Sequence, residues 1–323
     1  MKMRLSGRLP DMWNAAYDLV AQVPEGMVTT YGGVAKALGD IAASRFVGLA
    51  MSRNDDIVRV PCRRVVQSNG TLGGYTGGPG EKKRLLRREG IRISGDKIVD
   101  FQHVLFTDFK TDSPLARLRA MQRALKKKLV VKNQSRTPKL VAGIDVAYRN
   151  EHAFAAMVTF DLRTGVEVDR AVVEGNTQFP YIPTYLAFRE IPVIRPLMEL
   201  VDDSTVVMYD GNGILHPEGF GIASQVGVEF NVPTIGVAKK LLCGVVRGTP
   251  GRPQRPIVFD GRVVGHAVMT GPMRSPVYVS PGHMVAGESA VEIASRFLKH
   301  RIPEPTRVAH IVAGAARRGT NNK

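Results

Sequence analysis

Residues 204–216 read S-T-V-V-M-Y-D-G-N-G-I-L-H, a β-branched and apolar run that ends in an acid beside two glycines. A continuous apolar run of this composition is typical of a strand that is covered on both faces of a sheet. The glycines allow a sharp turn and leave room for a ligand to approach the backbone. The stretch therefore predicts a buried strand that presents Asp210 at its end.

Two further acids stand at the ends of expected elements. Asp145 closes the strand-like run at 140–144, and Glu190 ends residues 185–189, which we interpret as the opening of a helix. Three such carboxylates could converge on a hard divalent cation, because these ions prefer oxygen ligands. The alternative from spacing alone is that the acids cap helices and turns, which is a common role for Asp and Glu near glycine.

The segments around these acids predict a mixed sheet flanked by helices, and hence an α/β fold. Apolar strands are expected at 139–148 and 204–209, and a hairpin at 153–174 with its turn at 163–165. A helix is expected to begin at Pro114, because proline is favoured at the first helical position. We assign this helix to the C-terminal domain.

Residues 139–310 resemble endonuclease V, a family of nucleases that act on deaminated bases and have an RNase H-like, mixed-sheet fold. The match covers more than half of the chain, and its order and spacing are highly specific. It rests on G-I-D-V at 143–146, P-Y-I-P at 180–183, F-R-E at 188–190, D-G-N-G at 210–213, P-T-I-G-V-A-K at 233–239, G-H at 282–283 and P-E-P-T-R at 303–307.

The resemblance implies a metal-dependent nick 3′ to inosine, made with Mg²⁺, for which Mn²⁺ can substitute, and with no organic cofactor. Asp145 and Asp210 would be metal ligands, with Glu190 as a ligand directly or through water. Further catalytic roles are implied for Glu190, His216, Lys239 and His283. For each lone histidine the competing interpretation is a structural group that is satisfied by its neighbours.

The resemblance also implies how the lesion is recognised. Tyr181 would act as a wedge that replaces the lost stacking partner, and the flanking prolines would stiffen its loop. The competing interpretation is a tyrosine packed under the loop. Thr184 departs from the family, which commonly has glycine there. The pocket for the base would be lined by Leu186, Gly211, Gly213 and Ile222.

The N-terminal quarter has a different character. An amphipathic helix is expected at 12–23, followed by shorter helices at 31–38 and 41–53 that form a small helix-turn-helix, winged-helix-like domain. Cys62 lies between Pro61 and two arginines, and neighbouring positive charge favours the reactive thiolate. Cys243 has apolar neighbours and is expected to be a packing residue.

Residues 8–95 resemble the C-terminal domain of O6-alkylguanine-DNA alkyltransferases. The shared strings are V-T-T-Y-G at 28–32, R-F-V-G at 45–48, R-N at 53–54, P-C-R-R-V at 61–65, G-Y-T-G-G at 74–78 and R-E-G at 88–90. The resemblance implies that Cys62 accepts the alkyl group. Tyr31 and Arg45 would help to rotate the base out of the duplex, Asn54 would support the turn near the cysteine, and Tyr75 would line the pocket.

One departure from the alkyltransferase pattern concerns the proton of the thiol. The family has histidine after the cysteine, where this chain has Arg63. Arginine has no acceptor atom and stays protonated, so it cannot serve as a general base. It could stabilise a thiolate by its charge and pair with Glu89. The alternative is a domain that senses the lesion without accepting the alkyl group, although sensors of this type usually lack the cysteine.

The length and net charge of the chain predict its number of domains and the kind of partner that it binds. For 323 residues we expect two domains, at 1–95 and 113–323, joined by a linker at 96–112. The net charge is +16, and half of this excess lies in residues 101–140. Such a basic bridge favours a polyanionic partner, since each neutralised phosphate releases counterions. No apolar run is long enough to span a membrane, and we expect a cytoplasmic protein.

The two resemblances together imply a bifunctional DNA repair protein that transfers the alkyl group of O6-alkylguanine to Cys62 and nicks DNA 3′ to deaminated bases. Its expected partners are damaged DNA carrying O6-alkylguanine or deoxyinosine, and no membrane. The alternatives are an N-terminal lesion sensor attached to the nuclease, and a nuclease that acts on inosine-containing RNA.

Overall fold

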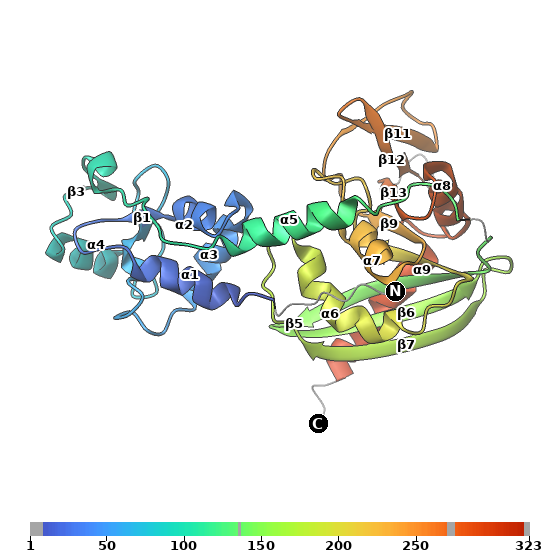
Figure 1. Ribbon diagram of the computed structural model, residues 1–323, viewed down its shortest axis with the longest axis horizontal. Coiled ribbons are helices and arrows are strands. Elements are labelled where there is room, and N and C mark those ends of the chain that lie inside the picture. Colours follow the sequence, from blue (N-terminus) through green and yellow to red (C-terminus); the bar gives the residue numbers. More distant parts are fainter. Residues whose placement is uncertain (1–8, 135–136, 270–274, 320–323) are drawn as a thin grey trace. The chain divides into compact units, whose positions relative to one another are not determined.

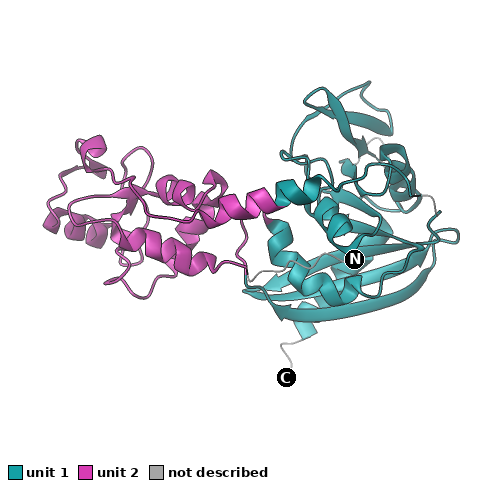
Figure 2. Cartoon of the chain, in the orientation of Figure 1, with its two compact units in different colours: residues 1–7, 122–178, 186–323 teal, residues 8–121, 179–185 magenta. Residues whose placement is uncertain are grey.

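The computed structural model describes residues 9–134, 137–269 and 275–319. It divides into two compact units (Figure 2). Unit 1 contains residues 122–178 and those from Leu186 onward. Of the described residues, unit 2 contains 9–121 together with Phe179–Tyr185. Within the described residues, no helix is long and apolar enough to cross a membrane.

Unit 1 is built on a mixed sheet, as the sequence predicts (Figure 1). Within the described residues its strand order is β10-β11-β12-β13-β9-β8-β5-β6-β7, with β5, β8 and β9 parallel to one another and the other neighbours antiparallel. The strands are β5 (Leu140–Arg149), β6 (His152–Asp161), β7 (Glu167–Asn176), β8 (Thr205–Asp210), β9 (Thr234–Ala238), β10 (Val245–Val246), β11 (Gln254–Phe259), β12 (Arg262–Val268) and β13 (Val277–His283).

Helices cover both faces of this sheet. One face packs against α6 (Leu186–Met198) and α7 (Ile222–Phe230), and the other against α8 (Gly287–Arg296) and α9 (Glu304–Gly319). Along β8 the side chains alternate between the two cores, because successive residues of a strand point to opposite faces. Val207 and Tyr209 face the α6 side, whereas Val206 and Met208 face the α9 side. This alternation gives β8 the continuous apolar sequence from which its burial was predicted.

Unit 2 begins with the three predicted helices. Asp11 caps the first and Thr30 caps the second, each by accepting a hydrogen bond from a backbone N–H. The third helix is preceded by a short 3-10 turn that takes up the first residues of the predicted segment. The three helices and the turn are α1 (Met12–Ala21), α2 (Tyr31–Ala37), η1 (Ile41–Ala43) and α3 (Ser44–Ser52).

The remaining elements of unit 2 are short. Cys62 opens a 3-10 turn that leads into a parallel two-stranded pairing of β1 with β2. These elements are β1 (Thr29–Thr30), η2 (Cys62–Arg64), β2 (Val65–Val66), α4 (Pro79–Arg88), β3 (Ile93–Ser94), β4 (Lys97–Ile98) and η3 (Phe101–Val104). Ile98, Phe101 and Val104 pack into the small core that contains Val28 and Leu86.

Helix α5 (Pro114–Lys126) begins at the predicted proline. The boundary between the compact units falls inside this helix, after Met121, so its first residues belong to unit 2. The domain limits 1–95 and 113–323, with their linker at 96–112, stay a prediction.

Candidate active sites

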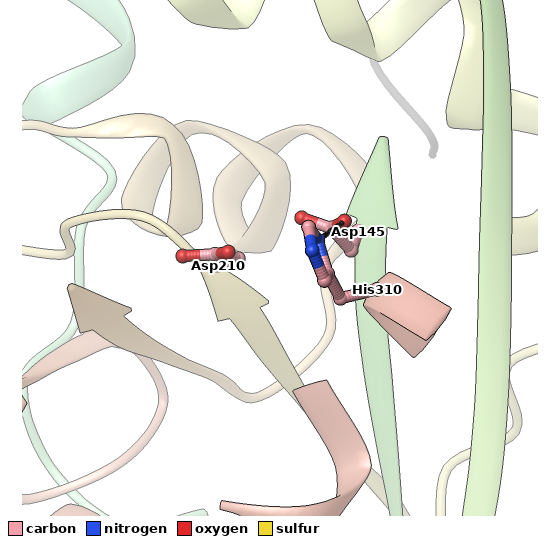
Figure 3. Close-up of side chains that lie close together, drawn as sticks. All are labelled: Asp145, Asp210 and His310. Carbon is pink, nitrogen blue, oxygen red and sulfur yellow. Dashed lines mark hydrogen bonds and ion pairs between the residues drawn. The ribbon is translucent and has the colours of Figure 1, made fainter. Parts of the chain in front are cut away.

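The strands of unit 1 place two carboxylates side by side. Ile144 of β5 is paired with Tyr209 of the parallel neighbour β8, so that Asp145 and Asp210 follow at equivalent positions. Together with His310 of α9 they form a group whose ligand atoms all lie within 4.8 Å of one another (Figure 3). The predicted convergence of Asp145 and Asp210 is therefore present.

His310 completes this group and was not predicted from the sequence. Its Nδ1 lies 2.8 Å from Oδ2 of Asp145. Helix α9 can approach β5 so closely because position 143 is glycine: a Cβ on Gly143 would lie 2.0 Å from the carbonyl carbon of Pro305. One feature of the sequence could have pointed to His310. It stands three residues after the string at 303–307, one turn farther along the same helix.

The electrostatics of the group favour a bound cation. Burial, and secondly the charge of Asp210, raise the pKa of Asp145 to about 6, although His310 and Lys239 oppose the shift. Lys239 lies just beyond β9, and its Nζ is 2.5 Å from Oδ2 of Asp210. Two neighbouring carboxylates, with an imidazole beside them, form a donor set that fits a divalent metal ion.

Glu190 lies close to this group, but its carboxylate oxygens accept hydrogen bonds from two tyrosines. It belongs to α6, which packs on the face of the sheet opposite to α9. Its oxygens accept hydrogen bonds from Tyr148 Oη at 2.7 Å and Tyr209 Oη at 2.6 Å. Burial raises its pKa to about 7, and the charges of Asp145 and Asp210 contribute to the shift. The structure thus places Glu190 within electrostatic reach of the two aspartates while two tyrosines hold its carboxylate.

The two histidines predicted to be catalytic, His216 and His283, lie at different places in unit 1. His216 is buried in the turn after β8, where its Nδ1 accepts a hydrogen bond from the backbone of Glu218 at 3.2 Å. His283 pairs with Thr234 at the start of β9, whereas Asp210 pairs with Val237, three residues farther along. That offset is roughly 10 Å along the strand. The structure does not bring His283 to the aspartates.

The ring of His283 also has a structural partner. Its Nδ1 accepts a hydrogen bond from the backbone N–H of Val130 at 3.2 Å, and burial lowers its pKa. A buried neutral imidazole that accepts a backbone hydrogen bond is satisfied where it is. We therefore leave His283 out of the catalytic group proposed below.

The predicted wedge at 180–183 lies in Phe179–Tyr185, a segment of unit 2 that we call the wedge loop. Tyr181 is 62% exposed, whereas Phe179, Ile182 and Tyr185 are buried. The ring of Tyr181 is therefore not packed under the loop. Thr184 has a positive φ of 70°. This conformation favours glycine, which accounts physically for the family's preference at this position.

Two of the predicted pocket residues, Gly211 and Ile222, lie together. A Cβ on Gly211 would lie 2.6 Å from Cγ2 of Ile222. Gly213 packs against β13 instead, where a Cβ would lie 2.0 Å from the carbonyl oxygen of Pro281. Leu186 is the half-buried first residue of α6. The missing side chain of Gly213 is therefore required by packing, and the base-binding role of the four residues stays a prediction.

In unit 2, Cys62 lines a cavity. Its lining includes Tyr31, Gly48, Met51, Gly74 and Tyr75. Nδ2 of Asn54 donates hydrogen bonds to Sγ of Cys62 at 3.3 Å and to the carbonyl of Val60 at 2.9 Å.

The structure thus brings Tyr31, Asn54 and Tyr75 to the cysteine. Burial, and secondly the charge of Cys62, raise the pKa of both tyrosines, so their phenols stay protonated. Arg45 is exposed near the start of α3 and does not line the cavity.

Arg63 forms the expected ion pair with Glu89. Its Nε lies 2.6 Å from Oε1 of Glu89, and Nε of Arg64 lies 2.8 Å from the other oxygen. Burial alone would raise the pKa of Glu89, but the hydrogen bonds from Arg64 and Arg63 lower it below its usual value. The carboxylate is therefore ionised and shared by the two arginines.

Lys82 of α4 is a second residue that was not predicted. It is fully buried, and its Nζ donates to the carbonyls of Val65 at 2.6 Å and Gly74 at 3.2 Å. Burial lowers its pKa to about 8, and the charge of Cys62 opposes this shift. The ammonium ties the strand after Cys62 to the wall of the cavity. The sequence K-K-R at 82–84 is typical of a solvated helix face, so it does not predict that Lys82 is buried.

Comparison with known proteins identifies both parts of the chain. The family model for endonuclease V matches residues 123–311, and that for the DNA-binding domain of 6-O-methylguanine DNA methyltransferase matches residues 11–91. A bifunctional methyltransferase/endonuclease from Picrophilus torridus is 38% identical over 95% of this chain and 97% of its own length. The chain belongs to the bifunctional methyltransferase/endonuclease family. It is an enzyme that combines a methyltransferase with a DNA repair endonuclease.

Solved structures resemble the endonuclease part of this bifunctional chain. Endonuclease V from Streptomyces avermitilis is 33% identical and covers 64% of this chain and 93% of its own, with a TM-score of 0.59. Endonuclease V from Ciona intestinalis, solved with a DNA that contains an inosine followed by a ribo-adenosine, is 28% identical. It covers 65% of this chain and 100% of its own, with a TM-score of 0.60.

Proposed function

We propose that this chain repairs two kinds of damaged base in DNA, nicking the strand 3′ to deoxyinosine and removing the alkyl group from O6-alkylguanine. The observation that carries the nuclease half is the convergence of Asp145, Asp210 and His310 within 4.8 Å. The transferase half is carried by Cys62 in its cavity between Tyr31 and Tyr75.

In the nuclease, the side chains of Asp145, Asp210 and His310 would hold Mg²⁺ or Mn²⁺. The bound ion would polarise the scissile phosphate and activate water. Lys239 supplies a fixed positive charge beside Asp210 that suits a phosphate oxygen. Glu190 adds negative charge near the aspartates while Tyr148 and Tyr209 keep it in place. The products would carry 3′-hydroxyl and 5′-phosphate ends.

Inosine is the proposed lesion because the relative from Ciona intestinalis was solved with an inosine-containing DNA. In this chain the exposed ring of Tyr181 is available to stack where the base leaves the helix. The ribo-adenosine in that same DNA favours a second candidate, a nuclease that requires or prefers a ribonucleotide after the inosine.

Four matched duplexes separate these candidates: inosine or guanine at one position, each followed by a deoxy- or a ribonucleotide. We expect nicking of both inosine duplexes and of neither guanine duplex. Nicking of the inosine duplex with the ribonucleotide alone would assign the domain to RNA. Equal cleavage of inosine and guanine would refute lesion specificity.

In the transferase, Sγ of Cys62 would attack the alkyl carbon, forming a carbon–sulfur bond while the bond from that carbon to guanine O6 breaks. The electron pair leaves with the guanine, which takes up a proton to balance the one lost by the thiol. The hydrogen bond from Asn54 stabilises the negative sulfur before attack. The protein is consumed once per transfer, because the thioether is not reversed.

Arg63 gives a specific prediction for this step. Arg63→Ala should lower the single-turnover transfer rate roughly tenfold, about 1.4 kcal/mol, because it removes the positive charge of the residue that follows Cys62 in the chain. Arg63→His should preserve or raise the rate, since a neutral imidazole can accept the thiol proton. The measurement is the transfer rate of all three proteins on O6-methylguanine DNA across a pH series. An alanine variant as fast as the wild type would show that the Arg63–Glu89 pair serves only the fold.

A further inference from the structure

Asp40 connects the helix-turn-helix to the wedge loop. It lies between α2 and α3 and caps η1, where its Oδ1 accepts a hydrogen bond from the N–H of Ala42 at 2.9 Å. Its Oδ2 faces the loop, accepting hydrogen bonds from Tyr185 Oη at 2.8 Å and from Arg119 at 3.0 Å. The two oxygens of one carboxylate thus serve two different tasks.

The end of the wedge loop is held by these partners. The guanidinium of Arg119 lies 4.2 Å from the ring centre of Tyr185 and donates to the hydroxyl of Thr184 at 2.5 Å. The hydroxyl of Tyr185 also approaches the carbonyl of Leu115 at 3.3 Å. Each of these groups lies within unit 2, to which Figure 2 assigns residues 179–185. The last two residues of the loop are fixed by side chains from outside it.

The charges in this cluster are well defined. Burial tends to raise the pKa of Asp40, but the hydrogen bonds from Ala42, Arg119 and Tyr185 bring it below its usual value. Burial and the hydrogen bond to Asp40 raise the pKa of Tyr185, so its phenol stays protonated and donates. The cluster is therefore an ionised carboxylate that receives two donors, a charge-assisted arrangement that is stronger than a neutral one.

The loop needs such support because of Thr184. This residue has a φ of 70°, which is unfavourable for a β-branched side chain. Its hydroxyl is held by Arg119, and Arg119 is held by Asp40. Tyr181 lies only three residues earlier, in a segment that two prolines stiffen. The position of the exposed Tyr181 ring therefore depends on how the end of the loop is fixed.

We propose that Asp40, in the methyltransferase-like part of the chain, is a positioning residue for lesion recognition by the endonuclease part, acting through Arg119, Thr184 and Tyr185. This inference rests on the proposed function, in which Tyr181 replaces the stacking partner of an extruded inosine. It makes the helix-turn-helix a structural support for the second enzyme.

Asp40→Asn is the discriminating variant. Asparagine keeps the Oδ1 cap of η1, since it caps helices as well as aspartate does. It replaces Oδ2 by an NH₂ group, which cannot accept from Tyr185 or Arg119. We expect kcat/KM for nicking an inosine duplex to fall about tenfold, mainly through KM, with transfer from O6-methylguanine unchanged within about twofold. Asp18→Asn, an exposed aspartate on α1 of the same unit, is the matched control and should behave as wild type.

A second readout reports the wedge directly. The fluorescence of 2-aminopurine placed beside the inosine rises when the neighbouring base is unstacked, and we expect a smaller rise with Asp40→Asn than with wild type. Tyr185→Phe, which removes one hydroxyl, should give the same direction of change. The double variant should be no worse than the stronger single variant, because both changes act on one contact.

Three results would overturn the inference. Normal nicking and fluorescence by Asp40→Asn, with Tyr181→Ala impaired, would refute the role of Asp40 and leave the wedge intact. Normal behaviour of Tyr181→Ala would refute the wedge and with it the inference. Equal loss of nicking and alkyl transfer in Asp40→Asn would show a general effect on the fold of unit 2.

Discussion

Asp210→Asn is expected to lower metal-dependent nicking of an inosine duplex by at least about 1,000-fold, roughly 4 kcal/mol of activation free energy. Asparagine has the shape of aspartate but lacks the charge that, with Asp145, favours a divalent cation. It also removes the ion-pair partner of Lys239, leaving an unbalanced ammonium at the site. The measurement is the single-turnover nicking rate at saturating protein.

The control for this variant is its methyltransferase activity. Labelling by O6-methylguanine DNA should stay at the wild-type level, since Asp210 and Cys62 belong to different compact units with separate cores. Asp203→Asn, which changes an exposed aspartate just before β8, should affect neither reaction. Loss of both activities in Asp210→Asn would indicate unfolding or a shared site instead of a metal ligand.

Cys62→Ala is expected to abolish transfer of a labelled methyl group from O6-methylguanine DNA, while the nicking rate stays within about twofold of wild type. The sulfur is the only atom of this residue that can accept the alkyl group, and Asn54 is directed at it. Labelled protein, digested and mapped, should carry one methyl group per chain on Cys62. A single label is expected because the thioether is not reversed.

Cys243→Ala provides the matched control for the cysteine variant. Cys243 is half-buried, and burial raises the pKa of its thiol, so it should be a poor nucleophile. Its replacement should leave the labelling unchanged. If wild-type protein binds the lesion but Cys62 remains unlabelled, the N-terminal part is a sensor.

The sheet of the endonuclease part could be predicted because the apolar sequence of its strands indicates that they are buried. The strand expected at 204–209 is β8, Thr205–Asp210, and the strand expected at 139–148 is β5, Leu140–Arg149. Both are covered on two faces and are therefore continuously apolar. Their parallel pairing places Asp145 beside Asp210, and this is why the acids at the strand ends were informative.

The other members of the sites depend on tertiary contacts that leave little trace in local sequence. His310 reaches Asp145 only because Gly143 lets α9 pack against β5. Lys82 stands in a charged helical segment, and only the fold shows that its side chain is buried. The link between Asp40 and Tyr185 joins residues 145 positions apart. No periodicity or spacing rule connects such residues.

Position in a family motif also did not determine geometry. His283 falls in a quoted string, yet β13 holds it opposite the start of β9, away from Asp210, with its ring bound to the backbone of Val130. Glu190 is close to the aspartates, but Tyr148 and Tyr209 hold both of its oxygens. For these two residues, the motif predicts the enzyme family but does not predict the contacts of the side chain.

We propose that one chain carries two independent chemistries, one at a metal site and one at a cysteine. The most direct measurement is a single reaction that contains an inosine duplex and a duplex with labelled O6-methylguanine, assayed for nicked DNA and protein-bound label, with Mg²⁺ or with a chelator. We expect the chelator to abolish nicking and to leave one methyl group per chain on Cys62. Nicking that persists in the chelator, or labelling that disappears with the metal, would contradict it.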